Sequence, residues 1–193
     1  MASLITHPVV PVVAALVVGR AVVSVPLLIL GISFSMLPDL DIIGFRLRIP
    51  YGSPFGHRGF SHSIVAALLL STAAVPLARA LKARPFVVFW FLSLSMLSHG
   101  ILDAFTRNAT NGVALFWPLS SERILFSFRP IEASPISLQR FMSERGLQVL
   151  WSEMVWVWIP LLAIGLVGLL IRRHMRANKQ LQPTRETRCG YRQ

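Results

Sequence analysis

The residues in this chain that are best suited to chemistry are histidines and aspartates, grouped in three short motifs. The motifs are LPDLD at residues 37–41, GHRGFSHS at residues 56–63 and SHGILD at residues 98–103. Imidazole nitrogens and carboxylate oxygens suit Zn²⁺, Mn²⁺ or Fe²⁺, and none of the motifs contains a thiolate that would favour Cu⁺. Together they predict a site for divalent metal ions.

The first motif places Asp39 and Asp41 two residues apart. From an extended loop, both carboxylates can turn toward one cation, and Pro38 is expected to end the preceding helix and stiffen the approach. The alternative is that the two aspartates are interfacial charges that mark a helix end, since so short a motif often occurs by chance.

The second motif brings His57 and His62 to the edge of an apolar run. Gly56 and Gly59 let the backbone bend, so that both rings can reach one ion. Ser61 is expected to be the N-cap of the helix that follows. The alternative reading puts one histidine at the interface and lets a helix-end carbonyl satisfy the other.

The third motif spaces His99 and Asp103 four residues apart, so that on a helix they share one face. An aspartate near the end of an apolar helix is costly unless it is paired, hydrated or bound to a cation. Gly100 would let a neighbouring helix approach closely. A private hydrogen bond between the histidine and the aspartate remains the alternative.

Composition indicates the elements that position these motifs. The 193 residues are 54% hydrophobic and 14% charged, with a mean hydropathy of +0.62, whereas soluble domains are roughly a quarter charged. An all-α fold follows: a multi-pass transmembrane bundle of four to five helices, in a single domain at residues 1–175. The expected helices are 4–19, 21–37, 62–81, 85–106 and 148–172, with an interfacial segment at 118–146 and a polar, disordered tail at 176–193.

Five crossings would bring most of the chemical residues to one membrane surface, with His99 one turn below it. The residues collected there are His7, Asp39, Asp41, His57, His62 and Asp103. Arg20, the 79–84 loop and the basic C-terminal tail would lie on the opposite face.

The net charge of +11 comes from cations at the ends of apolar runs, which is typical of membrane-flanking residues. No basic stripe interleaved with aromatic residues is present, which argues against a nucleic-acid partner. The expected partner is the lipid bilayer. The C-terminal cluster favours a cytoplasmic tail, and the oligomeric state is left open.

These motifs resemble those of a known family, the LexA-regulated, inner-membrane-bound, metal-dependent hydrolases. The resemblance covers roughly residues 1–120 and rests on THPVV, LPDLD, GHRGFSHS and SHGILDAFT, with Arg58 and Ser63 in register. Trp117-Pro118, after a TNG turn, is similar to a later block of that family. The resemblance implies a multi-pass bacterial inner-membrane protein and a hydrolase.

The leading hypothesis is a membrane-embedded metal-dependent hydrolase. A metal-activated water would attack an ester or phosphoester of an amphiphilic, lipid-like substrate at the bilayer surface. The metal is Zn²⁺ by preference, with Mn²⁺ or Fe²⁺ as alternatives. The expected ligands are Asp39, Asp41, His57, His62, His99 and Asp103, and those with catalytic roles are Asp41, His62 and Asp103. His7 is a possible additional ligand, and Arg58 could clamp an anionic group such as phosphate. The rival functions are non-enzymatic metal binding or transport, and a structural membrane protein whose polar residues only cap helices.

Overall fold

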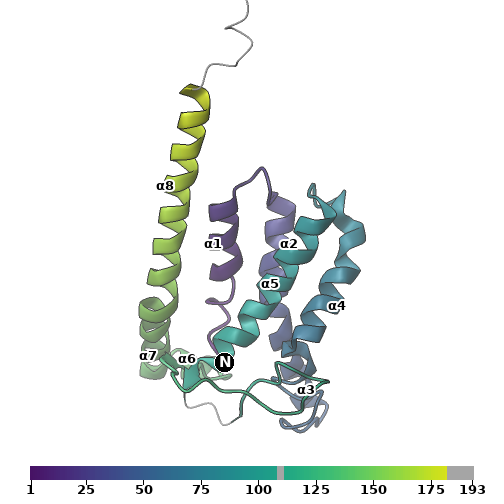
Figure 1. Ribbon diagram of the computed structural model, residues 1–193. Helices are drawn as coiled ribbons and strands as arrows, with labels where there is room; N and C mark the ends of the chain where they lie inside the picture. Colours follow the sequence, from purple (N-terminus) through teal and green to yellow (C-terminus); the bar gives the residue numbers. More distant parts are fainter. Residues whose placement is uncertain (108–110, 182–193) are drawn as a thin grey trace, which may run out of the picture.

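The computed structural model describes residues 1–107 and 111–181, with side chains to residue 178, and the fold is helical as expected (Figure 1). The first two helices, α1 (Val9–Val18) and α2 (Val25–Met36), form a hairpin. Gly19 ends α1 with a left-handed φ of 94°, a conformation that glycine adopts without steric cost. The second helix begins four residues later than expected because Ser24 caps it, accepting a hydrogen bond from the Leu27 amide at 3.2 Å.

The α2 helix does not end at Pro38. It tightens into a 3₁₀ turn, η1 (Leu37–Ile42), and continues into α3 (Ile43–Arg46). The expectation of an extended loop after Pro38 was therefore wrong. A proline at the first turn of a helical segment has no hydrogen bond to lose. The combined helix Val25–Arg46 is long and apolar enough to cross a membrane.

The next helical unit is η2 (Phe60–His62), followed by α4 (Ile64–Ala74) and η3 (Val75–Ala78). Its cap is Ser63, whose hydroxyl accepts from the Ala66 amide at 3.0 Å. The prediction that Ser61 caps this helix was wrong, because the Ser61 hydroxyl instead donates to Asp41 at 2.6 Å.

The helix α5 (Pro85–Ala104) is the centre of the bundle, packed between α2 and α4. Small and apolar side chains form its contacts with them. Its own Leu92 and Met96 are buried there with Leu27 of α2 and with Ala67 and Ala74 of α4. At Gly31 of α2 the approach is so close that an added Cβ would lie 2.4 Å from Phe91.

The last helix is a continuous rod built from α7 (Glu144–Glu153), a π-helical turn η4 (Met154–Trp158) and α8 (Ile159–Leu181). It packs on α1, and an added Cβ at Gly168 would lie 2.7 Å from Val17, as expected where small residues let membrane helices approach. At the far end of α1 the Arg172 side chain lies against Gly19. The expected disordered tail begins too early, because the helix runs to Leu181; residues 182–193 lie outside the described residues.

Among the described residues, three helices are long and apolar enough to span a membrane: Val25–Arg46, Pro85–Ala104 and Glu144–Asn178. Two further apolar helices, Val9–Val18 and Ile64–Ala78, are shorter. The expected interfacial segment contains β2 (Ile131–Glu132), which pairs with β1 (Thr106–Arg107), and α6 (Leu138–Phe141). It lies at the end of the bundle where the N-terminus, α3 and α6 are found, opposite the two hairpin turns (Figure 1).

Candidate metal centre

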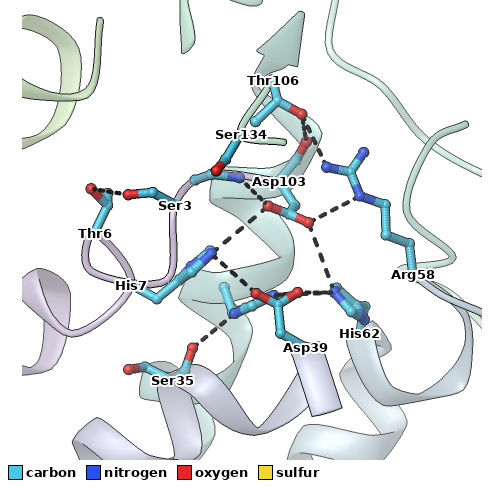
Figure 2. A network of polar contacts seen from close by, with 12 residues as sticks. Ser3, Thr6, His7, Ser35, Asp39, Arg58, His62, Asp103, Thr106 and Ser134 are labelled. Carbon is cyan, nitrogen blue, oxygen red and sulfur yellow. Dashed lines mark hydrogen bonds and ion pairs between the residues drawn. The ribbon is translucent and has the colours of Figure 1, made fainter. Parts of the chain in front are cut away.

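Four of the predicted ligands meet in one buried cluster at this end of the bundle (Figure 2). One ligand atom from each lies within 4.8 Å of the others. The four are Asp39 of η1, His62 of η2, and His99 and Asp103 of α5. The prediction from the spacing of the third motif is confirmed, since His99 and Asp103 lie on successive turns of α5 and face the same point. The close approach expected at Gly100 also occurs, because an added Cβ there would lie 2.9 Å from the His62 carbonyl oxygen.

The two imidazole rings of this cluster are held by their Nδ1 atoms. His99 Nδ1 lies 2.8 Å from the Ser35 carbonyl oxygen, and His62 Nδ1 lies 3.2 Å from Asp41 Oδ2. A carbonyl or an ionised carboxylate only accepts hydrogen bonds, so each Nδ1 must be the donor. In the neutral imidazole, the lone pair is then on Nε2, the atom that faces the cluster.

With both rings neutral and protonated on Nδ1, the two Nε2 lone pairs face each other. The Nε2 atoms of His62 and His99 are 3.1 Å apart, and Asp39 Oδ1 lies 3.3 Å from His99 Nε2. Neither oxygen of Asp39 has a hydrogen-bond partner in the described part of the chain. Three acceptor atoms this close repel one another unless a cation lies between them. An Nδ1–H donated to a carbonyl or carboxylate is also the usual outer support of a metal-bound histidine.

His7, a possible additional ligand, completes the wall of the cluster. Its ring stacks on His99 with centroids 3.7 Å apart, and its Nε2 lies 4.0 Å from Asp39 and 3.9 Å from Asp103. Burial, and after it the neighbouring His99, lower its pKa to about 3. Neither ring nitrogen has a hydrogen-bond partner among the residues described, so His7 presents a neutral, unused nitrogen to the site.

Arg58 is buried in the protein and does not lie at the interface. Its Nε is 3.0 Å from Asp103 Oδ2, and a second nitrogen donates to Thr106 at 3.1 Å. Its backbone has a φ of 63°, which is unusual for a non-glycine residue. The guanidinium is thus already paired with a member of the cluster, an arrangement that the sequence reading did not include.

The side-chain charges of the cluster, with its direct partners Asp41 and Arg58, do not balance by themselves. Asp39, Asp41 and Asp103 supply three negative charges, and Arg58 supplies one positive charge. Burial lowers the pKa of His62 as it does that of His7, so these rings add no charge at pH 7. A proton on His99 would offset one of the two remaining negative charges, whereas a divalent cation offsets both. Buried charge of one sign is costly unless it is compensated.

Asp41 and His57 lie one step away from this cluster. Asp41 Oδ1 is 2.5 Å from His57 Nδ1, while Oδ2 accepts from Ser61 and from the Arg58 amide at 3.1 Å. With His62 they form a second group whose ligand atoms lie within 4.8 Å of one another. The helical turn of η1 separates the two aspartates, so that Asp39 enters the first group and Asp41 the second.

The loop that carries His57 is held in place by features that the motif reading missed. The Arg123 guanidinium donates to three carbonyl oxygens, of His57, Tyr51 and Ser53, each at 3.0 Å. Gly56 is required by space, since an added Cβ would lie 2.2 Å from the Pro50 carbonyl oxygen. Only the glycines gave a sequence signal for this loop, because Arg123 is remote in the chain.

Glu153 is a buried acid that was not among the residues predicted from the sequence. Its carboxylate accepts from the Ser3 hydroxyl at 2.5 Å and from the Thr6 hydroxyl at 2.8 Å. Trp158 donates to the same Thr6 hydroxyl at 2.8 Å. These bonds hold the segment that carries His7 against the last helix. The only signal in the sequence was a charge directly before an uncharged run of 18 residues, residues 154–171.

Comparison with known proteins identifies the family. The YdjM inner membrane protein family matches residues 1–176. The inner membrane protein YbcI of Escherichia coli (strain K12) is 39% identical over 171 residues, which is 88% of this chain and 97% of that protein. No solved structure matches. The matched residues include the whole cluster and nearly all of the three long helices, and the chain therefore belongs to the YdjM inner membrane protein family.

Proposed function

We propose that the protein is a metal-dependent hydrolase that acts at the surface of the inner membrane. The proposed ligands of its cation are Asp39, His62, His99 and Asp103. The observation that carries the proposal is the pair of Nε2 atoms 3.1 Å apart beside an unpartnered carboxylate. Two nitrogen and two oxygen donors suit Zn²⁺ best, with Mn²⁺ or Fe²⁺ as alternatives.

A divalent cation bound there would lower the pKa of a coordinated water toward about 7 and polarise the oxygen of the scissile group. Hydrolysis adds one water across the bond: the acid keeps the hydroxyl, and the leaving alcohol takes the proton. His7, which is neutral and has a free nitrogen on the cluster, could accept a hydrogen bond from that water and orient it. Asp41 orients His62, and Arg58 holds Asp103.

We also propose an orientation. The basic residues after the last apolar run, Arg172, Arg173 and Arg176, favour a cytoplasmic C-terminus. Arg172 lies against Gly19 in the turn between α1 and α2. That turn is at the opposite end of the bundle from the N-terminus and α3, where the cluster lies (Figure 1), so this orientation would put the site on the outer face of the inner membrane. Cysteine labelling at single introduced sites in the 118–146 segment tests it, with labelling by a membrane-impermeant maleimide in intact spheroplasts as the expected result.

The test of function starts with the metal. The protein is purified in detergent, stripped with a chelator, reconstituted with Zn²⁺ or Mn²⁺ and analysed for bound metal by mass spectrometry. One equivalent is expected for the wild type, and about none for His62→Ala or Asp103→Ala. His174→Ala, at an exposed histidine of α8, is the matched control and should keep the metal.

Hydrolysis is then measured with 4-nitrophenyl carboxylic and phosphate esters, with and without metal. Metal-dependent turnover that is lost in His62→Ala supports the proposal. Metal binding without turnover of either ester class would favour a carrier instead. A wild type that binds no transition metal after reconstitution would refute the metal centre and with it the hydrolase.

A further inference from the structure

A cavity of about 550 Å³ opens directly beside the cluster. It lies where α2 passes through η1 into α3, and its other walls are the N-terminal segment, α6 and residues 134–136 before α6. Its walls are mostly aliphatic and aromatic, including Met36, Leu40, Ile43, Ile136, Leu138 and Phe141. Its volume is within the range of small-molecule sites.

One wall of this cavity belongs to the candidate metal centre. Asp39 lines it, although only 5% of this residue is exposed, and neither of its carboxylate oxygens has a hydrogen-bond partner in the described structure. Apart from Asp39, the polar side chains that line the cavity are Ser3 and Ser134. The cavity is therefore apolar along most of its length and polar at the end that meets the cluster. This is the shape of a site for a molecule with a hydrocarbon chain and one polar end.

The charges around the cavity indicate whether the polar end of its ligand is neutral or anionic. No lysine or arginine lines the cavity within the described residues. Arg58 is on the far side of the cluster, bound to Asp103. With a divalent cation present, the side-chain charges of the three carboxylates and Arg58 sum to zero. The amino group of Met1, which also lines the cavity, interacts with Asp103, so no cationic side chain of the cavity is left to pair with a phosphate. An uncharged ester fits this balance better than an anionic one.

We propose that the cavity binds the hydrocarbon chain of a long-chain carboxylic ester, with the uncharged ester group at Asp39. This inference rests on the proposed hydrolase function and names its substrate class. The open side of the cavity suits entry from the bilayer, since Leu40 and Ile43 are 60% and 57% exposed on a helix that is apolar enough to span it. A membrane-dissolved ester would then reach the cluster without crossing water.

The binding test uses the methyl ester of a dodecanoic acid with a mid-chain diazirine, added to the wild-type protein in phosphatidylcholine nanodiscs. After irradiation, mass spectrometry locates the label. The expected labels are on Leu40, Ile43 and Leu138. Ile43→Trp, which fills the cavity, should reduce them by roughly tenfold, whereas Ile29→Trp, on an equally exposed position of α2 (59%), should leave them unchanged. Equal labelling around Ile29 would mean that ordinary bilayer lipid covers both faces, and would overturn the proposal.

The hydrolysis test compares 4-nitrophenyl laurate with 4-nitrophenyl acetate, with bis(4-nitrophenyl) phosphate as the anionic ester. Burial of about three to four of the ten additional methylenes of laurate should raise kcat/KM over acetate by roughly 100-fold, and Ile43→Trp should reduce this ratio about tenfold. A ratio near one, or preferred turnover of the phosphate ester, would overturn the substrate class and leave the hydrolase standing. Cavity labelling without turnover of any ester would instead refute the hydrolase and leave the chain-binding site standing.

Discussion

The substitution Asp41→Asn tests whether the Asp41 carboxylate orients His62 or binds the metal itself. Its oxygens face donors in the His57, Ser61 and His62 side chains and in the Arg58 amide. All four contacts are between 2.5 and 3.2 Å, one at Oδ1 and three at Oδ2, the oxygen that faces His62. We therefore expect it to orient and polarise His62 without binding the metal itself.

Asparagine preserves the shape and, with its oxygen in the place of Oδ2, the three hydrogen bonds made there. What is lost is the negative charge behind the His62 ring. A hydrogen bond to a charged acceptor contributes about 1.5–3 kcal/mol, against about 0.5–1.5 kcal/mol for a neutral one. The loss should be about 1–2 kcal/mol, which corresponds to a metal affinity weaker by roughly 5- to 30-fold and agrees with the range found for outer supports of metal ligands.

The assay is a Zn²⁺ titration of the detergent-purified protein against a competing chelator, with stoichiometry from mass spectrometry. Asp41→Asn should still bind one equivalent, with weaker affinity, whereas Asp39→Asn should bind almost none. Glu122→Gln, a charge loss at an exposed acid, is the matched control. An unchanged affinity in Asp41→Asn would refute the orienting role. If the wild type binds two metals and Asp41→Asn loses one, Asp41 and His57 are ligands of a second metal.

Three further outcomes are expected. Ser63→Ala removes the cap of α4 and should lower the free energy of unfolding, measured by chemical unfolding in detergent, by about 1 kcal/mol. Ser61→Ala should leave the cap intact and weaken Zn²⁺ binding. The reverse pattern would contradict the assignment of Ser63 as the cap. Gly100→Ala places a Cβ 2.9 Å from the His62 carbonyl oxygen and should destabilise the protein by about 1–3 kcal/mol, so a variant as stable as the wild type would show that the 3₁₀ turn moves freely. Burial lowers the pKa of His7 to about 3 and also lowers that of His62. Because the unfolded chain then takes up protons at a higher pH than the folded one, the free energy of unfolding of the metal-free protein should fall as the pH drops below about 6.5. An unfolding free energy that stays constant between pH 7 and 5 would argue against buried neutral rings.

The class of fold and most of the cluster could be predicted because their signals are local. Apolar runs of membrane length follow from composition, and the spacing of His99 and Asp103 determines that they share a helix face. The convergence of three motifs at one end follows from counting crossings. The helix count was harder, because the two short apolar helices have the composition of membrane spans but not the length.

The rest depends on contacts between residues that are far apart in the chain. Whether Asp39 and Asp41 face one site depends on the backbone after Pro38, and a 3₁₀ turn points them differently from a loop. The choice between Ser61 and Ser63 as cap depends on Asp41, some twenty residues earlier, which takes the Ser61 hydroxyl. Glu153 has its partner Ser3 at the other end of the sequence, so no motif could reveal the pair.

The position of Arg172 against Gly19 has a consequence for how the protein sits in lipid. Glu153, at the level of the His7 segment, and Arg172 are the nearest charges on either side of the uncharged part of the last helix. At 1.5 Å per residue they are about 28 Å apart, close to the ~30 Å thickness of a bilayer hydrocarbon core. The length of this helix between the two charges would therefore fix the depth of the candidate metal centre in the bilayer. The proposed activity should then depend on bilayer thickness. In lipids with longer chains, the candidate centre would lie deeper than the ester groups of the lipids. Turnover should then decline although every side chain of the site is intact.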